Sequence, residues 1–190
     1  MKIPFSPPDI TEQEADEVRD ALLSGWITTG PRTKQLEREI ATFCETDRAV
    51  CLNSATACLE SVLRILGVRE GDEVITSAYT YTASASVVCH VGARLVLVDT
   101  QPDSYEMDYD KLADAITERT KVVIPVDLAG IPCDYDKIFR VVESQKHLFH
   151  PRNDIQKAFG RVIVSADAAH AFGRGIKLPS ATNNITNNCS

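Results

Sequence analysis

Short apolar runs alternate with segments of helical periodicity along most of the chain, and this alternation limits the possible fold more than any other feature. The runs have the length and β-branched content of buried strands and lie at Ala49–Leu52, Glu73–Thr76, Arg94–Val98, Lys121–Val126 and Arg161–Val164. Strands that alternate with helices predict an α/β fold, in which a mostly parallel sheet has helices on both faces.

Local signals indicate where the helices begin. Thr11-Glu-Gln-Glu14 is a capping box, because the threonine hydroxyl and the glutamate carboxylate can each satisfy a free backbone N–H. A helix is expected from there to about Ser24, with Gly25 as its stop. Further helices are expected at about 33–44, from Ser54 to Leu66, from Ser77 to Val91, after Asp108, and at about 134–146 and 155–159.

Polar and aromatic residues follow the ends of two early strands, where open α/β sheets bind their ligands. Asn53-Ser-Ala-Thr56 opens a helix, whose free N–H groups and dipole suit an anion. A plain N-cap by Ser54 is the alternative. Tyr79 or Tyr81 follows the next strand, and either ring is suited to stack on a planar ligand or to pack in the core.

The nine residues from Ser165 to Gly173 follow the last apolar run. A strand that ends in Asp167 puts a carboxylate at the carboxyl edge of the sheet, with His170 three residues later and small alanines beside both. A carboxylate beneath a pyridine-type cofactor keeps the ring nitrogen protonated, so that the ring can accept electrons. The alternative is an aspartate that caps a turn and a histidine that fills a gap.

The loop from Gly25 to Pro31 combines two glycines with the only tryptophan of the chain. An aromatic side chain beside glycines is typical of a ligand-binding loop. A buried tryptophan that anchors a turn is an equal alternative, and the loop alone does not separate the two.

Charge and hydropathy exclude several classes of function. The 190 residues contain 20 Lys and Arg against 27 Asp and Glu, a net charge of -7, which argues against a nucleic-acid-binding protein. No apolar run approaches the roughly 20 residues of a membrane span, and the N-terminus has no apolar signal core, so the expected location is the cytoplasm. Glycine motifs for dinucleotides and P-loops are absent, and no Cys or His spacing indicates a metal site.

Six segments together resemble the DegT/DnrJ/EryC1/StrS family of sugar aminotransferases, which use pyridoxal 5'-phosphate. They read SGWITTGPRTKQLE, NSATACLESVL, GDEVITSAYTYTASA, GARLVLVD, TKVVIPVDLAGIPCDYD and ADAAHAFG. The resemblance implies the large domain of the aspartate aminotransferase type I fold. It divides the chain into an N-terminal helix and substrate loop (1–30), a partial cofactor-binding domain (31–175) and a tail expected to be disordered (176–190).

The resemblance also implies a role for individual residues. The phosphate of pyridoxal phosphate, or of pyridoxamine phosphate, would be held by Ser54, Ala55 and Thr56. Tyr81 would stack on the ring, and the catalytic pair would be Asp167 at the ring nitrogen and His170 at the phenolic oxygen. Four residues would line the nucleotide-sugar site: Trp26, Ile27, Thr28 and Gly30. Related enzymes move an amino group from glutamate to a nucleotide-linked keto-sugar and are homodimers with shared active sites.

One family feature is not found in this sequence. In the family a Schiff-base lysine follows the DAAH motif within a pattern like SFHAxKN, and Lys177 lies too early and lacks those flanking residues. The sequence therefore predicts the N-terminal portion of an aminotransferase, truncated before the lysine and the small C-terminal domain and inactive as this chain. Two alternatives stay open, a non-catalytic cofactor-binding or regulatory homologue and a sugar dehydratase relative in which His replaces the lysine.

Overall fold

The computed structural model describes residues 7–174. Contacts divide the chain into two compact units, and the division falls between Cys51 and Leu52. Each unit is described by itself below. The three domains expected from the sequence stay a prediction, and Lys177 and the predicted disordered tail lie outside the described residues.

The first unit contains two helices, α1 (Glu12–Leu23) and α2 (Pro31–Phe43). The predicted capping box is formed, because Gln13 N donates to Thr11 Oγ1 over 3.2 Å and Thr11 N donates to Glu14 Oε2 over 2.7 Å. Gly25 follows α1 with a φ of 73°, as a helix stop requires. Neither helix has a buried residue.

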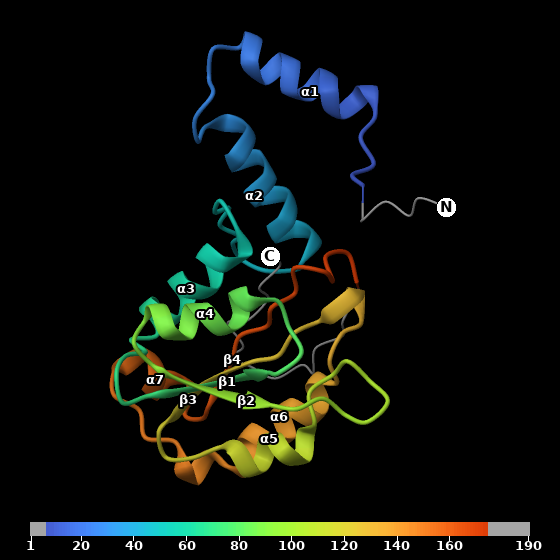
Figure 1. Cartoon of the computed structure of the whole chain (residues 1–190). Coiled ribbons are helices and arrows are strands. Elements are labelled where there is room, and N and C mark those ends of the chain that lie inside the picture. Colours follow the sequence, from blue (N-terminus) through green and yellow to red (C-terminus); the bar gives the residue numbers. More distant parts are fainter. Residues whose placement is uncertain (1–6, 175–190) are drawn as a thin grey trace. The chain divides into compact units, whose positions relative to one another are not determined.

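The second unit is built on a sheet of four parallel strands: β1 (Glu73–Ser77), β2 (Arg94–Val98), β3 (Thr120–Ile124) and β4 (Ile163–Val164). The strands lie in the order β2-β1-β3-β4 (Figure 1). The chain therefore moves outward from β1 to β2 and then returns across β1 to β3. The loops that leave β1 and β3 diverge at this reversal, which is where open α/β sheets bind ligands.

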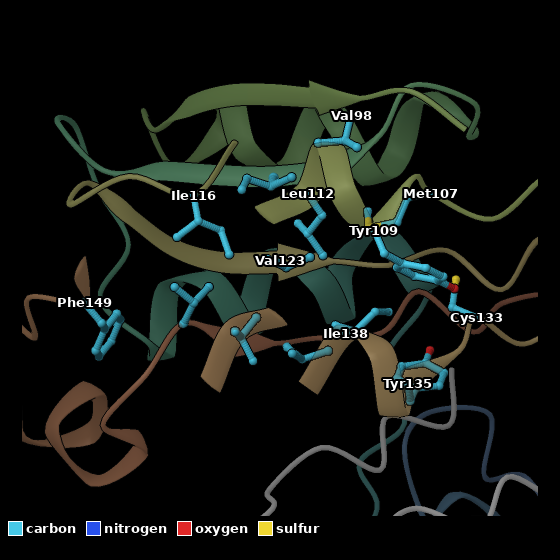
Figure 2. Close-up of a cluster of buried hydrophobic side chains, with 14 residues drawn as sticks. Val98, Met107, Tyr109, Leu112, Ile116, Val123, Cys133, Tyr135, Ile138 and Phe149 are labelled. Atoms are coloured by element: carbon cyan, nitrogen blue, oxygen red, sulfur yellow. The ribbon is translucent and has the colours of Figure 1, made fainter. Parts of the chain in front are cut away.

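Helices cover both faces of this sheet, as the sequence predicted. One apolar cluster joins the sheet to α5 (Tyr109–Ala115) and α6 (Tyr135–Ser144), and Figure 2 shows Leu112, Val123 and Ile138 within it. The other cluster joins the opposite face to α3 (Ala55–Ile65) and α4 (Thr82–His90), with α7 (Asp154–Phe159) contributing Phe159. Short 3-10 turns complete the unit at η1 (Leu128–Gly130) and η2 (Lys146–Leu148).

The strands divide their side chains between these two clusters residue by residue. Val122 and Ile124 belong to the α3–α4 cluster, whereas Val123 between them belongs to the α5–α6 cluster. All three side chains are fully buried. A strand covered on both faces has no polar alternation, which is why these strands read as continuous apolar runs in the sequence.

Two expected elements differ in the structure. The run Ala49–Leu52 is not a strand, and the side chain of Val50 is 73% exposed. A strand exists only through backbone pairing, which an apolar run by itself cannot supply. The helix expected from Ser77 begins five residues later, because Ser77 still pairs with Val98 and Ala78 N donates to Val98 O over 2.8 Å.

The buried carboxylate of Glu73 forms hydrogen bonds and ion pairs that join neighbouring segments at the amino end of the sheet. Its oxygens accept from Thr117 Oγ1 at 2.6 Å and from Arg119 Nη2 at 2.7 Å, and Arg94 Nη1 lies at 3.4 Å. Burial raises the pKa of Glu73, but the hydrogen bonds from Thr117 and Arg119 and the two arginine charges outweigh it. The pKa therefore lies below its ordinary value of 4.5.

Replacement of this carboxylate by Glu73→Gln should destabilise the protein in a pH-dependent way. A lowered folded-state pKa gives stability that is fully present above pH 4.5 and is lost as the pH falls through the folded-state value. We expect a loss of about 1–3 kcal/mol in urea unfolding at pH 7 and a smaller loss near pH 3. Glu143→Gln, at an exposed ion pair, is the control and should have little effect. An equal loss at both pH values would contradict the electrostatic account.

Candidate functional site

Asp167 lies at the carboxyl edge of the sheet, where the sequence places it. Backbone pairing continues past β4, because Ser165 N donates to Val123 O over 2.9 Å and Asp167 N donates to Pro125 O over 2.8 Å. Asp127 N in turn donates to Asp167 O over 3.0 Å, and Val126 forms a parallel bridge with Asp167. These bonds fix the backbone of Asp167 relative to the loop that leaves β3.

Asp167 is 8% exposed, and its carboxylate accepts hydrogen bonds from one hydroxyl and one N–H. Ser84 Oγ donates to its Oδ2 over 2.6 Å, and Ala169 N donates to its Oδ1 over 3.3 Å. Within residues 7–174 no Lys, Arg or His forms an ion pair with it. A buried carboxylate normally needs a cationic partner. The site can therefore accept a cationic N–H group from a ligand.

The structure separates the two tyrosines that the sequence left as alternatives. Tyr79 stacks on Tyr105, with ring centroids 5.6 Å apart and ring planes 21° apart. Tyr81 is the N-cap residue of α4, three positions before Ser84, and is 77% exposed. Because Tyr79 already has a ring partner, Tyr81 is the more available surface for a planar ligand.

His170 contacts the loop after β3. Its Nδ1 accepts a hydrogen bond from Ala129 N over 3.3 Å, and His170 is exposed to solvent. A neutral imidazole whose Nδ1 accepts holds its proton on Nε2. Gly130, at a φ of 75°, passes close by, and a Cβ there would lie 3.2 Å from His170 O. The structure thus joins the DAAH turn to the η1 loop, with His170 presenting a donor nitrogen.

The segment Asn53–Thr56 forms the start of α3. Ala57 N donates to Ser54 Oγ over 3.2 Å, and Ser54 Oγ donates to Asn53 Oδ1 over 3.1 Å, so Ser54 is an N-cap. The N–H groups of Ala55 and Thr56 lie in the first turn, where helices leave donors free for an anion.

The first turns of α3 and α4 lie at the same edge of the sheet. The helix α3 leads through a short turn into β1, and α4 follows β1 directly, so both run against the strands and begin at the carboxyl edge (Figure 1). The two helices pack against each other. The residues Thr56, Tyr81 and Asp167 therefore lie at one edge of the sheet. Ser54 contributes only to its own helix start, since its hydrogen bonds are to Asn53 and Ala57.

The loop with Trp26 belongs to the first unit. Trp26 Nε1 donates to Thr29 O over 3.1 Å, and a Cβ on Gly30 would lie 2.1 Å from that nitrogen, so only glycine fits beneath the ring. The side chain of Trp26 is 58% exposed, and Ile27 and Thr28 are exposed as well. Within the first unit the indole anchors its own turn, as the alternative expected, but it is not buried in a core.

Sequence reasoning missed two residues of the site, Ser84 and Asp127. Asp127 is 1% exposed, and its carboxylate accepts from Tyr135 Oη at 3.0 Å and from Cys133 N at 2.9 Å. Burial raises the pKa of Asp127, the two hydrogen bonds oppose that rise, and the nearby charge of Asp167 adds to it. Asp127 follows the end of a strand, and that position could have identified it as a candidate site residue. A serine inside a helix gives no such signal for Ser84.

Across residues 7–174, no group of three or more His, Cys, Asp and Glu side chains could hold a metal ion. No helix in the same range is long and apolar enough to cross a membrane.

Comparison with known proteins shows what the chain is similar to. The sugar aminotransferase-like protein Spr1654 from Streptococcus pneumoniae, in its PMP form, superposes with a TM-score of 0.88 at 60% identity, over 91% of this chain and 44% of that one. The spore coat polysaccharide biosynthesis protein SpsC of Bacillus subtilis is 41% identical over 169 residues, which is 89% of this chain and 40% of SpsC. The UDP-4-amino-4-deoxy-L-arabinose–oxoglutarate aminotransferase of Shewanella sediminis is 39% identical over 171 residues, which is 90% of this chain and 40% of the relative.

The chain thus spans less than half the length of each of these relatives. Its α/β architecture is that of the fold-type I, pyridoxal phosphate-dependent sugar aminotransferases. A family model for the DegT/DnrJ/EryC1/StrS aminotransferases matches residues 8–177, nearly the whole chain. The chain therefore belongs to the DegT/DnrJ/EryC1/StrS aminotransferase family.

Proposed function

We propose that the second unit is the cofactor-binding part of a sugar aminotransferase and binds pyridoxal 5'-phosphate or pyridoxamine phosphate at the carboxyl edge of the sheet. The observation that carries this proposal is the carboxylate of Asp167, which is buried, hydrogen-bonded and without a cationic partner among residues 7–174. A protonated pyridine nitrogen is the kind of partner that such a carboxylate accepts.

The other groups at this edge fit the remaining parts of the same molecule. The N–H groups of Ala55 and Thr56 in the first turn of α3, with the Thr56 hydroxyl, suit a phosphate dianion. The exposed ring of Tyr81 suits the face of a pyridine ring. The Nε2 proton of His170 suits a phenolic oxygen.

Each residue has a distinct task in the proposed reaction. When bound, the cofactor supplies an electron-accepting ring and carries the amino group between substrates. Asp167 holds a proton on the ring nitrogen by electrostatic attraction, and its burial strengthens that attraction. Tyr81 covers one face of the ring and excludes water there, and the first turn of α3 holds the phosphate and so fixes the orientation of the ring.

The reaction of the whole protein is part of the same proposal. We infer amino transfer from glutamate to a nucleotide-linked keto-sugar, supported by similarity to an aminotransferase that is named for a UDP-sugar. Trp26, Ile27, Thr28 and Gly30 are proposed to line the sugar nucleotide, in a cytoplasmic homodimer. The alternatives of a non-catalytic homologue and a sugar dehydratase stay predictions, because no residue of the described range separates them.

The first test is binding of pyridoxamine phosphate by this chain, since that form needs no Schiff-base lysine. Asp167→Asn keeps the shape of the side chain but removes the charge that stabilises a pyridinium. We expect at least about tenfold weaker binding in calorimetric titration at neutral pH, the loss of one charge-assisted hydrogen bond. Asp154→Asn, 97% exposed on α7, is the control and should bind like the wild type. A wild-type chain that does not bind, or an Asp167→Asn chain that binds equally well, would overturn the proposal.

A second test concerns the phosphate alone. Thr56→Val keeps the volume of the side chain and removes its hydroxyl, so binding of pyridoxamine phosphate should weaken by about three- to tenfold. Binding of pyridoxamine, which lacks the phosphate, should not change between the two proteins. An equal loss for both ligands would show that the substitution disturbs α3 rather than a phosphate contact.

A further inference from the structure

A short chain of hydroxyl groups leads from the loop after β1 to the carboxylate of Asp167. Thr80 Oγ1 lies 2.9 Å from Ser84 Oγ, and Ser84 Oγ lies 2.6 Å from Asp167 Oδ2. Ser84 has no exposed surface, and Thr80 is partly buried. Ser84 and Asp167 are 83 positions apart in the sequence, so this contact ties α4 to the end of β4.

The chemistry of these groups fixes the direction of the hydrogen bonds. An ionised carboxylate can only accept, so Ser84 donates its hydroxyl proton to Asp167. The Ser84 oxygen is then left as an acceptor, and Thr80 is the donor to it. Both hydroxyl protons thus point toward the carboxylate, which complements its ionised form.

Asp167 has a second buried acid as its neighbour and few other hydrogen-bond donors. Asp127 is adjacent, because its N–H donates to Asp167 O over 3.0 Å, and its own carboxylate is buried beside the same loop. The nearby charge of Asp167 is one of the causes that raise the pKa of Asp127. Among the described residues, the carboxylate of Asp167 itself accepts only from the hydroxyl of Ser84 and from the more distant N–H of Ala169.

We infer that Ser84, with Thr80 behind it, is a positioning residue that holds Asp167 ionised and in a fixed rotamer for the ring nitrogen of the cofactor. The inference rests on the proposed function of Asp167. It also links the two parts of the proposed ring site, since Thr80 adjoins Tyr81 and Ser84 is carried by the helix that Tyr81 caps.

The test uses pyridoxamine phosphate labelled with 15N in the ring and bound to the full chain. The 15N shift reports whether the ring nitrogen is protonated, and its pH titration is compared between variants. Ser84→Ala should bind about tenfold more weakly, and its ring nitrogen should lose the proton at lower pH than in the wild type. Thr80→Val should shift the titration in the same direction by less, and it serves as the second variant if Ser84→Ala does not fold.

Two variants serve as controls. Thr80→Ser keeps the hydroxyl, so its binding and its ring titration should match those of the wild type. Ser86→Ala removes a hydroxyl from the same helix that donates only locally, to Ala83 O at 3.2 Å, and should also behave like the wild type.

The outcomes separate the inference from the proposal on which it rests. Weaker binding by Ser84→Ala with an unchanged titration of the ring would assign Ser84 a packing role and overturn the inference. If Asp167→Asn loses binding but Ser84→Ala matches Ser86→Ala, the inference fails and the proposed function stands. A wild-type chain that does not bind pyridoxamine phosphate overturns both.

Discussion

The backbone pairing of β3 with β4 extends beyond the regular strands, and the arrangement of the proposed site depends on it. The bonds from Ser165 N, Asp167 N and Asp127 N continue the ladder past Val164 to the edge of the sheet. An aspartate on a free loop would turn toward water, because hydration of a carboxylate is strongly favourable. Here the ladder keeps Asp167 in a position where its carboxylate is buried, and the hydroxyl of Ser84 meets it there.

Three buried acids of the second unit illustrate different ways to stabilise a carboxylate. Glu73 at the amino edge is held by a hydroxyl and two arginines, and its pKa is lowered. Asp127 at the carboxyl edge has only neutral donors, and its burial raises its pKa. Asp167 likewise has only neutral donors among the described residues, and it lies at the same edge as the first turns of α3 and α4. The acid paired with arginines stabilises the amino edge of the sheet, whereas the two acids that have only neutral donors lie at the edge of the proposed cofactor site.

The topology explains why groups distant in sequence share one edge. In a parallel sheet every strand ends at the same side, and every helix that connects two strands begins there. The reversal between β1 and β3 adds diverging loops at that side. Thr56, Tyr81 and Asp167 need no special arrangement to come to this edge. Thr56 and Tyr81 lie at the starts of helices that begin there, and Asp167 follows a strand that ends there. Packing of α3 against α4 then sets how their first turns lie.

Much of the fold was predictable from local sequence signals. The bounds of β2, the capping box of α1 and the N-caps at Ser54 and Asp108 are as expected, because each depends on residues within one or two turns of chain. The place of Asp167 after the last strand was predictable for the same reason. Its proposed role, and those of Tyr81 and His170, were suggested by the family resemblance and stay predictions.

Three features required the tertiary structure. The run Ala49–Leu52 has the composition of a strand, but pairing is a long-range property and no pattern in the run specifies a partner. Tyr79 and Tyr81 are equivalent in sequence, and only the contact with Tyr105 distinguishes them. The bond from Ser84 to Asp167 joins residues of two elements that meet only after the sheet has formed. The sequence determined the order of elements and the polar groups at their ends, because these depend on neighbours along the chain. The folded structure decided which of those groups meet, because burial and long-range hydrogen bonds depend on neighbours in space.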